Sequence, residues 1–477
     1  MRGSASPARP VNARVAVVLP YWDFWEASVG PEFRAERERL LERVVDRVGA
    51  VGVDVVWSGM VAGPDEASAA ADEVVGVDPE AILVAVSMAV PPTHSTELLD
   101  RVDVPVVVWA VQNAETVDDD FDAGSITSLG STVGTPMLTS VLRRRGRHHD
   151  LHVSSLSDPA GAGAVAEFLA GAATATRLAR ARLARVGSPM AGYDCVDAPD
   201  ADLEASLGLT VVSVAPVEIR RRYEAVTDVE TQERLAAVRT GFRVEEGDDD
   251  GLERSVRLAA AMSSLDDDEH IALGAMNCHV PEIRFGDEPG ITPCFGLGSE
   301  TSRGIPWTCT GDVLTAIAMF VARSLGGAAL YHEIEAIDFE TDEVALANSG
   351  EHDLGWCPAG VTPSLGPNAW YSRDPRTGVC VRFELPTGPA SLVGFVVAPD
   401  DPGGLRLVVA EGEITGRELP RSPTVGGLFR FASAPATDAW RRWASAGVNH
   451  HSAAAPGHLA RAVAATAGHL GIGFVEV

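Results

Sequence analysis

The first 180 residues of this chain alternate between short apolar runs and longer amphipathic segments. Runs such as RVAVVLPYW (14–22), AILVAVSMA (81–89) and VPVVVWAVQ (104–112) are rich in β-branched residues and have the length of strands. Between them lie segments with helical periodicity, such as FRAERERLLERVVDRVGAVG (33–52). Buried strands separated by helices predict a parallel sheet that is covered on both faces.

The same alternation resumes after Ala181, with a strand pattern at GLTVVSVAP (208–216) and a helix pattern at VLTAIAMFVARSLGG (313–327). After about residue 330 the strands become short, closely spaced and interrupted by Gly and Pro, which predicts an antiparallel barrel or sandwich. The predicted fold class is therefore α/β, with two doubly wound parallel-sheet domains followed by a mostly antiparallel β domain. We expect a disordered lead-in at 1–13 and domains at 14–178, 179–328 and 329–477, the last with a closing helix.

Composition limits the possible partners. The net charge of −29, from 67 acidic and 38 basic residues, argues against nucleic-acid and anionic-membrane binding, because both need a positive surface. The six cysteines are far apart and form no CxxC pair, so we expect no disulfide framework and a reducing, cytoplasmic location. No apolar run is long enough to span a membrane, and the chain has no GxGxxG or Walker motif for a nucleotide.

Polar side chains that could carry chemistry gather in three late segments. They are the strand-to-helix junction at 309–312, the strand pattern LYHEIEAIDF (330–339), and GVNHHSAAAPGH (447–458), which we expect to be a Gly-led loop before the last helix. On a strand, Glu333 and Glu335 would share one face. A histidine pair with one or two carboxylates suits Mn²⁺, Co²⁺ or Mg²⁺, although single loop histidines are more often surface residues.

Other candidates have plain structural alternatives. Trp22 follows the first strand, and ligands of parallel sheets sit at such strand ends, but an ordinary loop residue is as good an interpretation. The segment GRHHDLH (146–152) could form a second metal site, yet we favour a solvent-exposed turn there. His458 and His469 lie in the last predicted helix, and we expect both to be structural.

The order of the segments resembles the L-arabinose isomerase and L-fucose isomerase family over nearly the whole chain. The points of similarity are VVLPYWDFWE, VPVVVWAVQ, LRRRGR, GSPMAGYDC, PCFGLGSETSRGIPWTCTGDVLTAIAMF, YHEIEAIDFE, VALANSGEHD, LVVAEGEI and NHHSAAAPGHLARAVAATAGHLGI. The last is the most specific, since a His pair before a Gly-led helix at the C-terminus is hard to obtain by chance.

The resemblance implies two Rossmann-like domains and a C-terminal β domain. It also implies an enzyme that interconverts an aldose and a ketose, a small-molecule substrate, with a divalent metal, usually Mn²⁺. Members of the family are homo-oligomers, often trimers or hexamers, with the active site at a subunit interface. We therefore expect the substrate of this chain to contact residues from two subunits.

The resemblance also implies roles for particular residues. Glu333 falls at the position of an acidic metal ligand that acts in acid–base catalysis, and His450 at the C-terminal histidine ligand. Candidate substrate contacts are Trp22, Met190, Cys278, Asn348, His352 and His451. Asn348 stands where arabinose isomerases have a ligand histidine, and Cys278 where an aromatic residue often lines the sugar.

One position departs from the family pattern. Two residues before Asp312 the family has a glutamate that is both a metal ligand and half of the proton-transfer pair, and here Thr310 stands in its place. A threonine hydroxyl is no base near neutral pH. Loss of one acid–base group costs roughly 10²–10⁴ in rate. The nearby groups that could replace the glutamate are His332, His352, Cys309 and Asp312, although Asp312 is more simply explained as a residue of the first helical turn.

Three functional interpretations follow from this sequence. The chain is a sugar isomerase in which a nearby group replaces the glutamate, or a related metal enzyme of specialised metabolism acting through an enediolate. Otherwise it is a non-catalytic homologue that binds a polyol or a partner. Retention of Glu333, His450 and His451 favours an enzyme, because a mere binder has no need for a carboxylate beside two histidines.

Overall fold

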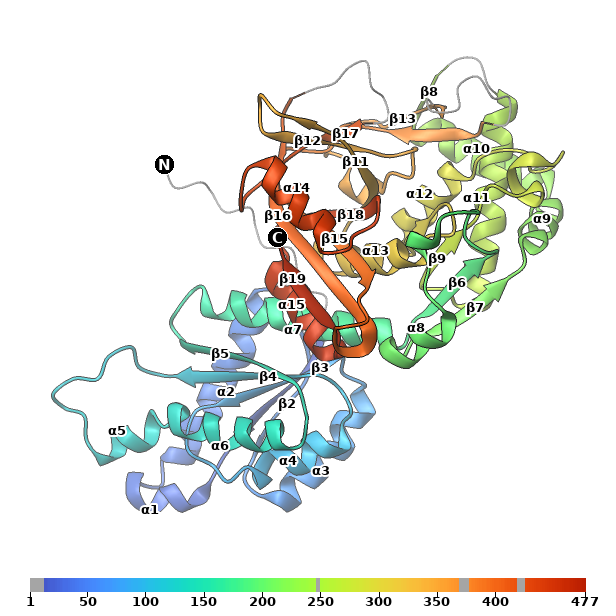
Figure 1. The fold of residues 1–477 in the computed structure, drawn as a ribbon. Coiled ribbons are helices and arrows are strands. Elements are labelled where there is room, and N and C mark those ends of the chain that lie inside the picture. The colour runs from blue at the N-terminus through green and yellow to red at the C-terminus, as the bar shows by residue number, and fades with distance from the viewer. Residues whose placement is uncertain (1–12, 246–248, 369–376, 418–424) are drawn as a thin grey trace. The chain divides into compact units, whose positions relative to one another are not determined.

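The computed structural model describes residues 13–245, 249–368, 377–417 and 425–477 (Figure 1). Residues 1–12, most of the predicted lead-in, lie outside this part of the chain. The contacts divide the chain into two compact units. The first consists of Met1–Arg177 with Ala464–Gly471, and the second of Leu178–Val463 with Ile472–Val477.

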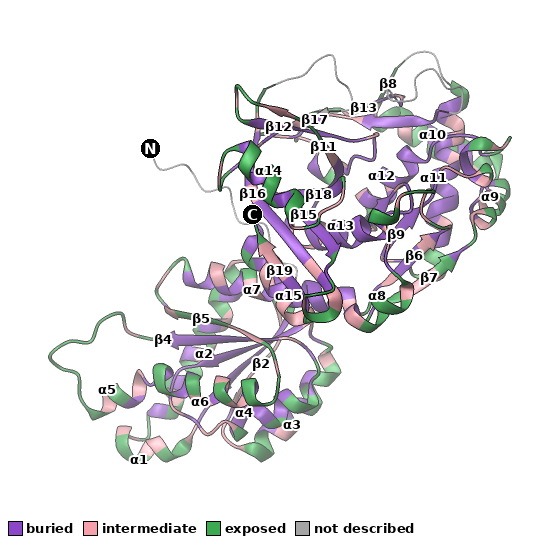
Figure 2. Cartoon of the chain, viewed as in Figure 1, coloured by how far each residue is buried: buried purple, intermediate pink, exposed green. Residues whose placement is uncertain are grey.

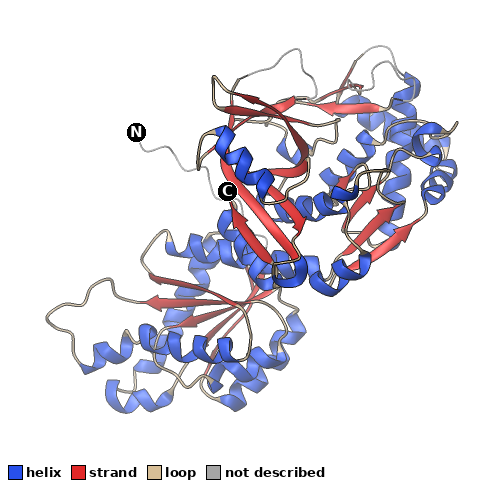
Figure 3. Cartoon of the chain, viewed as in Figure 1, coloured by secondary structure: helices blue, strands red, loops and turns tan. Residues whose placement is uncertain are grey.

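The first unit is built on a five-stranded parallel sheet with the strand order β2-β1-β3-β4-β5. Its strands are β1 (Arg14–Pro20), β2 (Asp54–Val61), β3 (Ala81–Val86), β4 (Val106–Gln112) and β5 (His149–Ser155). Its helices are η1 (Asp23–Trp25), α1 (Glu26–Val29), α2 (Phe33–Ala50), α3 (Pro64–Val77), α4 (Thr93–Arg101), α5 (Ala123–Ser128), α6 (Ser131–Arg144) and α7 (Gly161–Ala179) (Figure 3).

Both faces of this sheet are buried. Val15 and Val17 of β1 belong to a core with residues of α2 and α7, whereas Ala16 and Val18 belong to a core with residues of α3, α4 and α6. Every residue of β3 is buried, as Figure 2 shows for the middle of the sheet. This double burial explains the uninterrupted apolar runs and confirms the predicted parallel sheet.

The second unit begins with a four-stranded parallel sheet of order β10-β9-β6-β7. The strands are β6 (Arg182–Val186), β7 (Thr210–Val214), β9 (Leu273–Met276) and β10 (Trp307–Thr308). The helices are η2 (Asp194–Val196), α8 (Asp200–Leu207), α9 (Pro216–Ala225), α10 (Asp228–Gly241), α11 (Asp249–Glu269), η3 (Pro281–Phe285), α12 (Cys294–Arg303) and α13 (Val313–Gly326). Short β8 (Arg243–Val244) pairs with the later strand β13 at the edge of a separate three-stranded sheet of order β14-β13-β8.

A mostly antiparallel barrel follows, as the strand spacing predicts. Its ring runs β15-β18-β11-β12-β17-β16 and closes because β16 also pairs with β15, while β19 adds to β16 in parallel. The strands of this sheet are β11 (Leu330–Asp338), β12 (Glu343–Ala347), β15 (Gly388–Val397), β16 (Leu405–Thr415), β17 (Val425–Phe431), β18 (His451–Pro456) and β19 (Gly473–Glu476). The strands β13 (Ser364–Pro367) and β14 (Val379–Arg382) belong to the three-stranded sheet with β8. The helices are η4 (Leu354–Trp356), η6 (Pro402–Gly404), α14 (Ala436–Ser445) and α15 (Ala460–Leu470).

Three local expectations were wrong. His458 precedes the last helix, Ala460–Leu470, instead of lying in it. The segment 451–456 is strand β18 rather than part of a loop, and it pairs with both β11 and β15. The segment 149–152 belongs to β5, so only residues 146–148 of the expected turn lie outside regular structure. All six cysteines have free thiols. No helix among the described residues combines the length and apolar character needed to cross a membrane.

A buried acid pair lies beside the parallel sheet of the second unit. Trp307 donates its indole N–H to Asp266 Oδ2 at 3.1 Å, and Arg303 pairs with Glu300 Oε2 at 2.5 Å. Burial and then the neighbouring Glu300 raise the pKa of Asp266 to about 9. The folded chain therefore keeps a proton on Asp266 that the unfolded chain releases above its ordinary pKa near 4, and stability falls as the pH rises through this range.

We expect Asp266→Asn to relieve this penalty, because the amide oxygen still accepts from Trp307 and carries no charge. The gain in melting temperature over the wild type should be larger at pH 8.5 than at pH 5.5, as measured by thermal unfolding across pH. Asp268→Asn, at an exposed aspartate two residues away, is the control and should show a pH-independent difference. Parallel curves for wild type and Asp266→Asn would contradict the assigned protonation.

Candidate functional site

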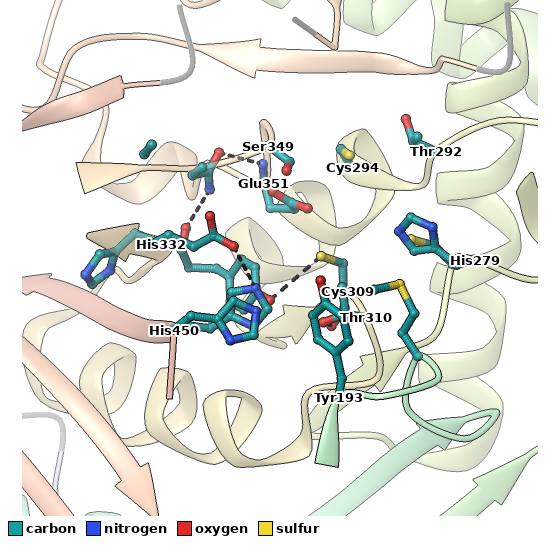
Figure 4. Close-up of a pocket in the computed structure, with 17 residues that line it drawn as sticks. Tyr193, His279, Thr292, Cys294, Cys309, Thr310, His332, Ser349, Glu351 and His450 are labelled. Carbon is teal, nitrogen blue, oxygen red and sulfur yellow. Dashed lines mark hydrogen bonds and ion pairs between the residues drawn. The ribbon is translucent and has the colours of Figure 1, made fainter. Parts of the chain in front are cut away.

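A pocket of about 680 Å³, open mouth included, lies within the second unit. One side is formed by residues that follow strands β6, β9 and β10, at the carboxyl edge of the parallel sheet, where ligands of such sheets bind. The other side comes from β11, from β12 and the turn after it, and from the start of β18 (Figure 4). The lining residues are Met190, Tyr193, Cys278, His279, Thr292, Cys294, Cys309, Thr310, Tyr331, His332, Glu333, Ala347, Asn348, Ser349, Glu351, His450 and His451.

The imidazole of His451 bridges two carboxylates at one wall of the pocket. Its Nδ1 lies 2.8 Å from Asp312 Oδ2, and its Nε2 lies 3.0 Å from Glu333 Oε1. Burial lowers the pKa of His451, but hydrogen bonds to Asp312 and Glu333 outweigh burial and raise it to about 9. Burial raises the pKa of Glu333, but hydrogen bonds from His451 and Glu335, together with the charges of His451 and His450, outweigh burial and lower it to about 2.

Asp312 carries out two tasks at once. It is the N-cap of α13, where its carboxylate accepts from the backbone N–H of Thr315 at 2.7 Å and from the Thr315 hydroxyl at 2.8 Å. The same carboxylate faces His451 Nδ1 and is fully buried. The interpretation of Asp312 as a first-turn residue therefore describes its backbone contacts, and the contact to His451 links that helix start to the pocket.

Glu333 also contacts a second carboxyl on its own strand. The carboxyls of Glu333 and Glu335 are hydrogen-bonded to each other, which with burial raises the pKa of Glu335 to about 7. The pairing of β11 with β12 shifts register between Ile334 and Ala336, so Glu335 lies at a β-bulge. Bulges re-aim side chains near functional sites, and this one accompanies the contact between the two carboxyls.

The junction at 309–312, which contains Thr310, has an unusual backbone. Thr310 has φ +57°, which is rare for a β-branched residue, and Gly311 follows with φ +77°. The Thr310 hydroxyl donates to the carbonyl of Cys309 at 2.7 Å, and the Thr310 carbonyl accepts from the N–H of Met190 at 3.0 Å. A Cβ at Gly311 would lie 2.8 Å from Pro189 Cα, so the two loops pack backbone to backbone.

Glu351 is a pocket residue that the sequence analysis missed. Its side chain is fully buried, and among the described residues no side-chain hydroxyl, side-chain amide or charged side chain donates to either carboxyl oxygen. Burial and then the negative charge of the nearby Cys294 side chain in its thiolate form raise its pKa well above the ordinary range. A signal existed, because Glu351 stands in a Gly-containing turn right after a buried strand, but nothing in the sequence shows that the turn faces inward.

The structure brings most of the predicted site residues together. Met190, Cys278, Thr310, Glu333, Asn348, His450 and His451 all line the pocket. Asn348 uses its amide locally, donating to the Tyr331 carbonyl at 2.7 Å and accepting from the Glu351 N–H at 3.1 Å. His352 is buried outside the lining with its ring against Phe383. Trp22 belongs to the first unit, and its role stays a prediction.

Three of these side chains suit a divalent cation. Glu333, His450 and His451 each offer one ligand atom, and these atoms lie within 4.8 Å of one another. If Nε2 of His451 loses its proton while Nδ1–H still donates to Asp312, the lone pair of Nε2 points toward Glu333. A carboxylate behind a ligating histidine is the usual arrangement in metal sites because it fixes the tautomer and the ring orientation. The donor set of one carboxylate and two imidazoles thus fits a metal.

Comparison with known proteins supports a relationship to sugar isomerases. The chain is 24% identical over 339 residues to sulfoquinovose isomerases from Priestia aryabhattai and from Priestia megaterium (strain ATCC 12872 / QMB1551). Each alignment covers 69% of this chain and 70% of the relative. No protein-family model matches the chain. The similarity supports a sugar isomerase in general and does not single out the L-arabinose and L-fucose isomerase family.

The close packing at Gly311 can be tested by substitution. We expect Gly311→Ala to destabilise the chain by roughly 2–3 kcal/mol, because a side chain at positive φ is strained and its Cβ overlaps Pro189. Gly192→Ala is the matched control, since Gly192 also has a positive φ but its Cβ would meet nothing within 4 Å. The control should lose only about 1 kcal/mol in denaturant unfolding. Equal losses would argue against the close approach of the two loops.

Proposed function

We propose that this chain is a divalent-metal-dependent aldose–ketose isomerase. The observation that carries the proposal is the group of Glu333, His450 and His451 at the rim of the pocket, with Asp312 behind His451. The similarity to two sulfoquinovose isomerases supports the same class of reaction. We further propose Mn²⁺ as the metal and a homo-oligomer, trimer or hexamer, whose neighbouring subunit completes the substrate contacts.

Isomerisation of an aldose moves one hydrogen from C2 to C1 and one proton from O2 to O1. When bound, a divalent metal would supply Lewis-acid stabilisation of the negative charge that develops on the substrate oxygens. Glu333, His450 and His451 are the residues that would hold it. In this proposal the contact between Asp312 and His451 keeps the imidazole in the tautomer that can ligate.

The proton transfers need a base and an acid, and one glutamate of the usual pair is Thr310 here. The carboxyl pair of Glu333 and Glu335 supplies a replacement, because the two groups share a hydrogen bond and ionise at different pH values. A pair of carboxyls with separated pKa values is the normal source of an acid and a base in one site. We propose that Glu333 accepts the proton from C2 and returns it to C1, while Glu335 in its protonated form donates a proton to O1 and then accepts the proton from O2.

The pocket lining bears on the choice of substrate. Among the described lining residues, no Arg or Lys is present, and the possible cations are histidines. A sulfonate is best held by charge-assisted hydrogen bonds. We therefore propose an uncharged aldose, and the sharpest comparison is sulfoquinovose against quinovose, which differ in that one group. Equal or higher kcat/KM for quinovose is expected, whereas a strong preference for sulfoquinovose would place a cation from elsewhere at the pocket.

Glu333→Gln tests the reaction itself. The change keeps the shape of the side chain but removes the charge, so we expect loss of bound metal and a fall in kcat of about 10²–10⁴. The measurements are metal content by elemental analysis and an aldose–ketose assay with added Mn²⁺, with His450→Ala in parallel. Glu340→Gln is the control, because Glu340 does not line the pocket. A wild type that binds sugar without turnover would favour the non-catalytic alternative.

Asp312→Asn tests the residue behind the histidine. We expect metal affinity to fall by about 10–100-fold, because the amide orients His451 less well than a carboxylate does. Asp353→Asn is the matched control, since Asp353 is also a buried capping aspartate, with Gly355 N–H at 2.8 Å, but lies outside the pocket. Metal titration of both variants, beside their unfolding curves, separates affinity from stability. Equal affinity losses in the two variants would contradict this role.

A further inference from the structure

A second group of side chains that could hold a metal ion belongs to the first unit. His148 precedes β5, Asp150 lies on β5, and His469 lies on the last helix of the chain. β5 is an edge strand of the sheet, paired with β4 alone. All three residues belong to the first unit, because Ala464–Gly471 packs with that unit.

The three side chains converge on one point. His469 Nε2 lies 2.9 Å from Asp150 Oδ2, and His148 Nε2 lies 3.9 Å from Asp150 Oδ1. The two imidazole rings stand edge to face with centroids 4.7 Å apart. One ligand atom from each residue falls within 4.8 Å of the others. The hydrogen bond between His469 and Asp150 needs only two of these side chains, and the ring contact needs only the two histidines. Neither contact by itself explains why all three ligand atoms lie close together.

The side chains of Asp150 and His469 are held by the packing around them, whereas that of His148 can move. The side chain of His469 is 3% exposed and that of Asp150 is 13% exposed, whereas that of His148 is 46% exposed. The ring of His148 lies over Gly468, where a Cβ would come within 2.4 Å of its Nε2. Glycine at this position therefore opens the space into which the third donor reaches.

We propose that His148, Asp150 and His469 form a second site for a divalent transition-metal ion of the zinc class. Two imidazoles and one carboxylate are a common ligand set for Zn²⁺, with bonds of about 2.0–2.2 Å and water in the fourth position. Donor atoms of such a site lie roughly 3.3 Å apart, so only the half-exposed His148 has to shift. The ion fastens the C-terminal helix to the edge strand of the first unit.

The test uses the full chain with Glu333→Gln and His450→Ala, which removes the pocket site from the measurement. We expect this protein to bind about one equivalent of Zn²⁺ by calorimetry and of Co²⁺ by visible absorption typical of four-coordinate cobalt. Zinc should also raise the melting temperature. Adding His469→Ala or His148→Ala to this protein should abolish zinc and cobalt binding. Because His148 is half exposed, we expect the His148→Ala variant to fold normally.

His149→Ala is the matched control. Its ring nitrogen Nδ1 contacts the Arg147 carbonyl at 3.3 Å rather than the cluster, so zinc binding should persist. Absence of zinc and cobalt binding in the protein lacking the pocket ligands would overturn the proposal. Binding that survives both His148→Ala and His469→Ala would overturn it as well. Neither result depends on whether the chain is an isomerase.

Discussion

The arrangement of side chains in the pocket depends on the imidazole of His451, which contacts two carboxylates. It joins the start of α13, through Asp312, to β11, through Glu333, and it stands at the first residue of β18. Asp312 is fully buried, and a buried carboxylate without a positive partner is strongly destabilising. One side chain therefore both neutralises a helix cap in the interior and fixes the carboxylate at the pocket wall.

The loop that enters α13 shows how backbone shape and chemistry are coupled here. Two successive residues with positive φ, Thr310 and Gly311, turn the chain so that it contacts the loop after β6 and delivers Asp312 beneath His451. The close approach of these two loops therefore requires a residue without a side chain at position 311.

Periodicity predicted the architecture well because the apolar pattern of each segment reports its own burial. The parallel sheet, the antiparallel barrel and the closing helix all follow from runs that need no knowledge of distant partners. Strand β18 escaped because its sequence, HSAAAP, has no β-branched residue, and pairing with β11 and β15 overrides that local preference.

Site residues that belong to local sequence motifs could be predicted from the sequence. Those that reach the site through contacts between distant segments could not. Glu333 and the histidine pair are visible in the sequence and do meet in the structure. Glu351 looks like a surface turn residue until the fold encloses it. Asp150 and His469 are in contact although most of the chain separates them in the sequence. The β-bulge at Glu335 depends on the partner strand, so neither feature can be recognised in the local sequence.

The first unit is built from two segments that are far apart in the sequence, and this affects how it folds during synthesis. Its final piece, Ala464–Gly471, is separated from Arg177 by about 290 residues. Thr466 and Ala467 of that piece are fully buried, and Thr466 donates to the Gly171 carbonyl at 3.1 Å. At about 5–20 residues per second of synthesis, the nascent first unit waits roughly 15–60 s for its last helix. A fragment ending near Arg177 would leave that surface uncovered permanently.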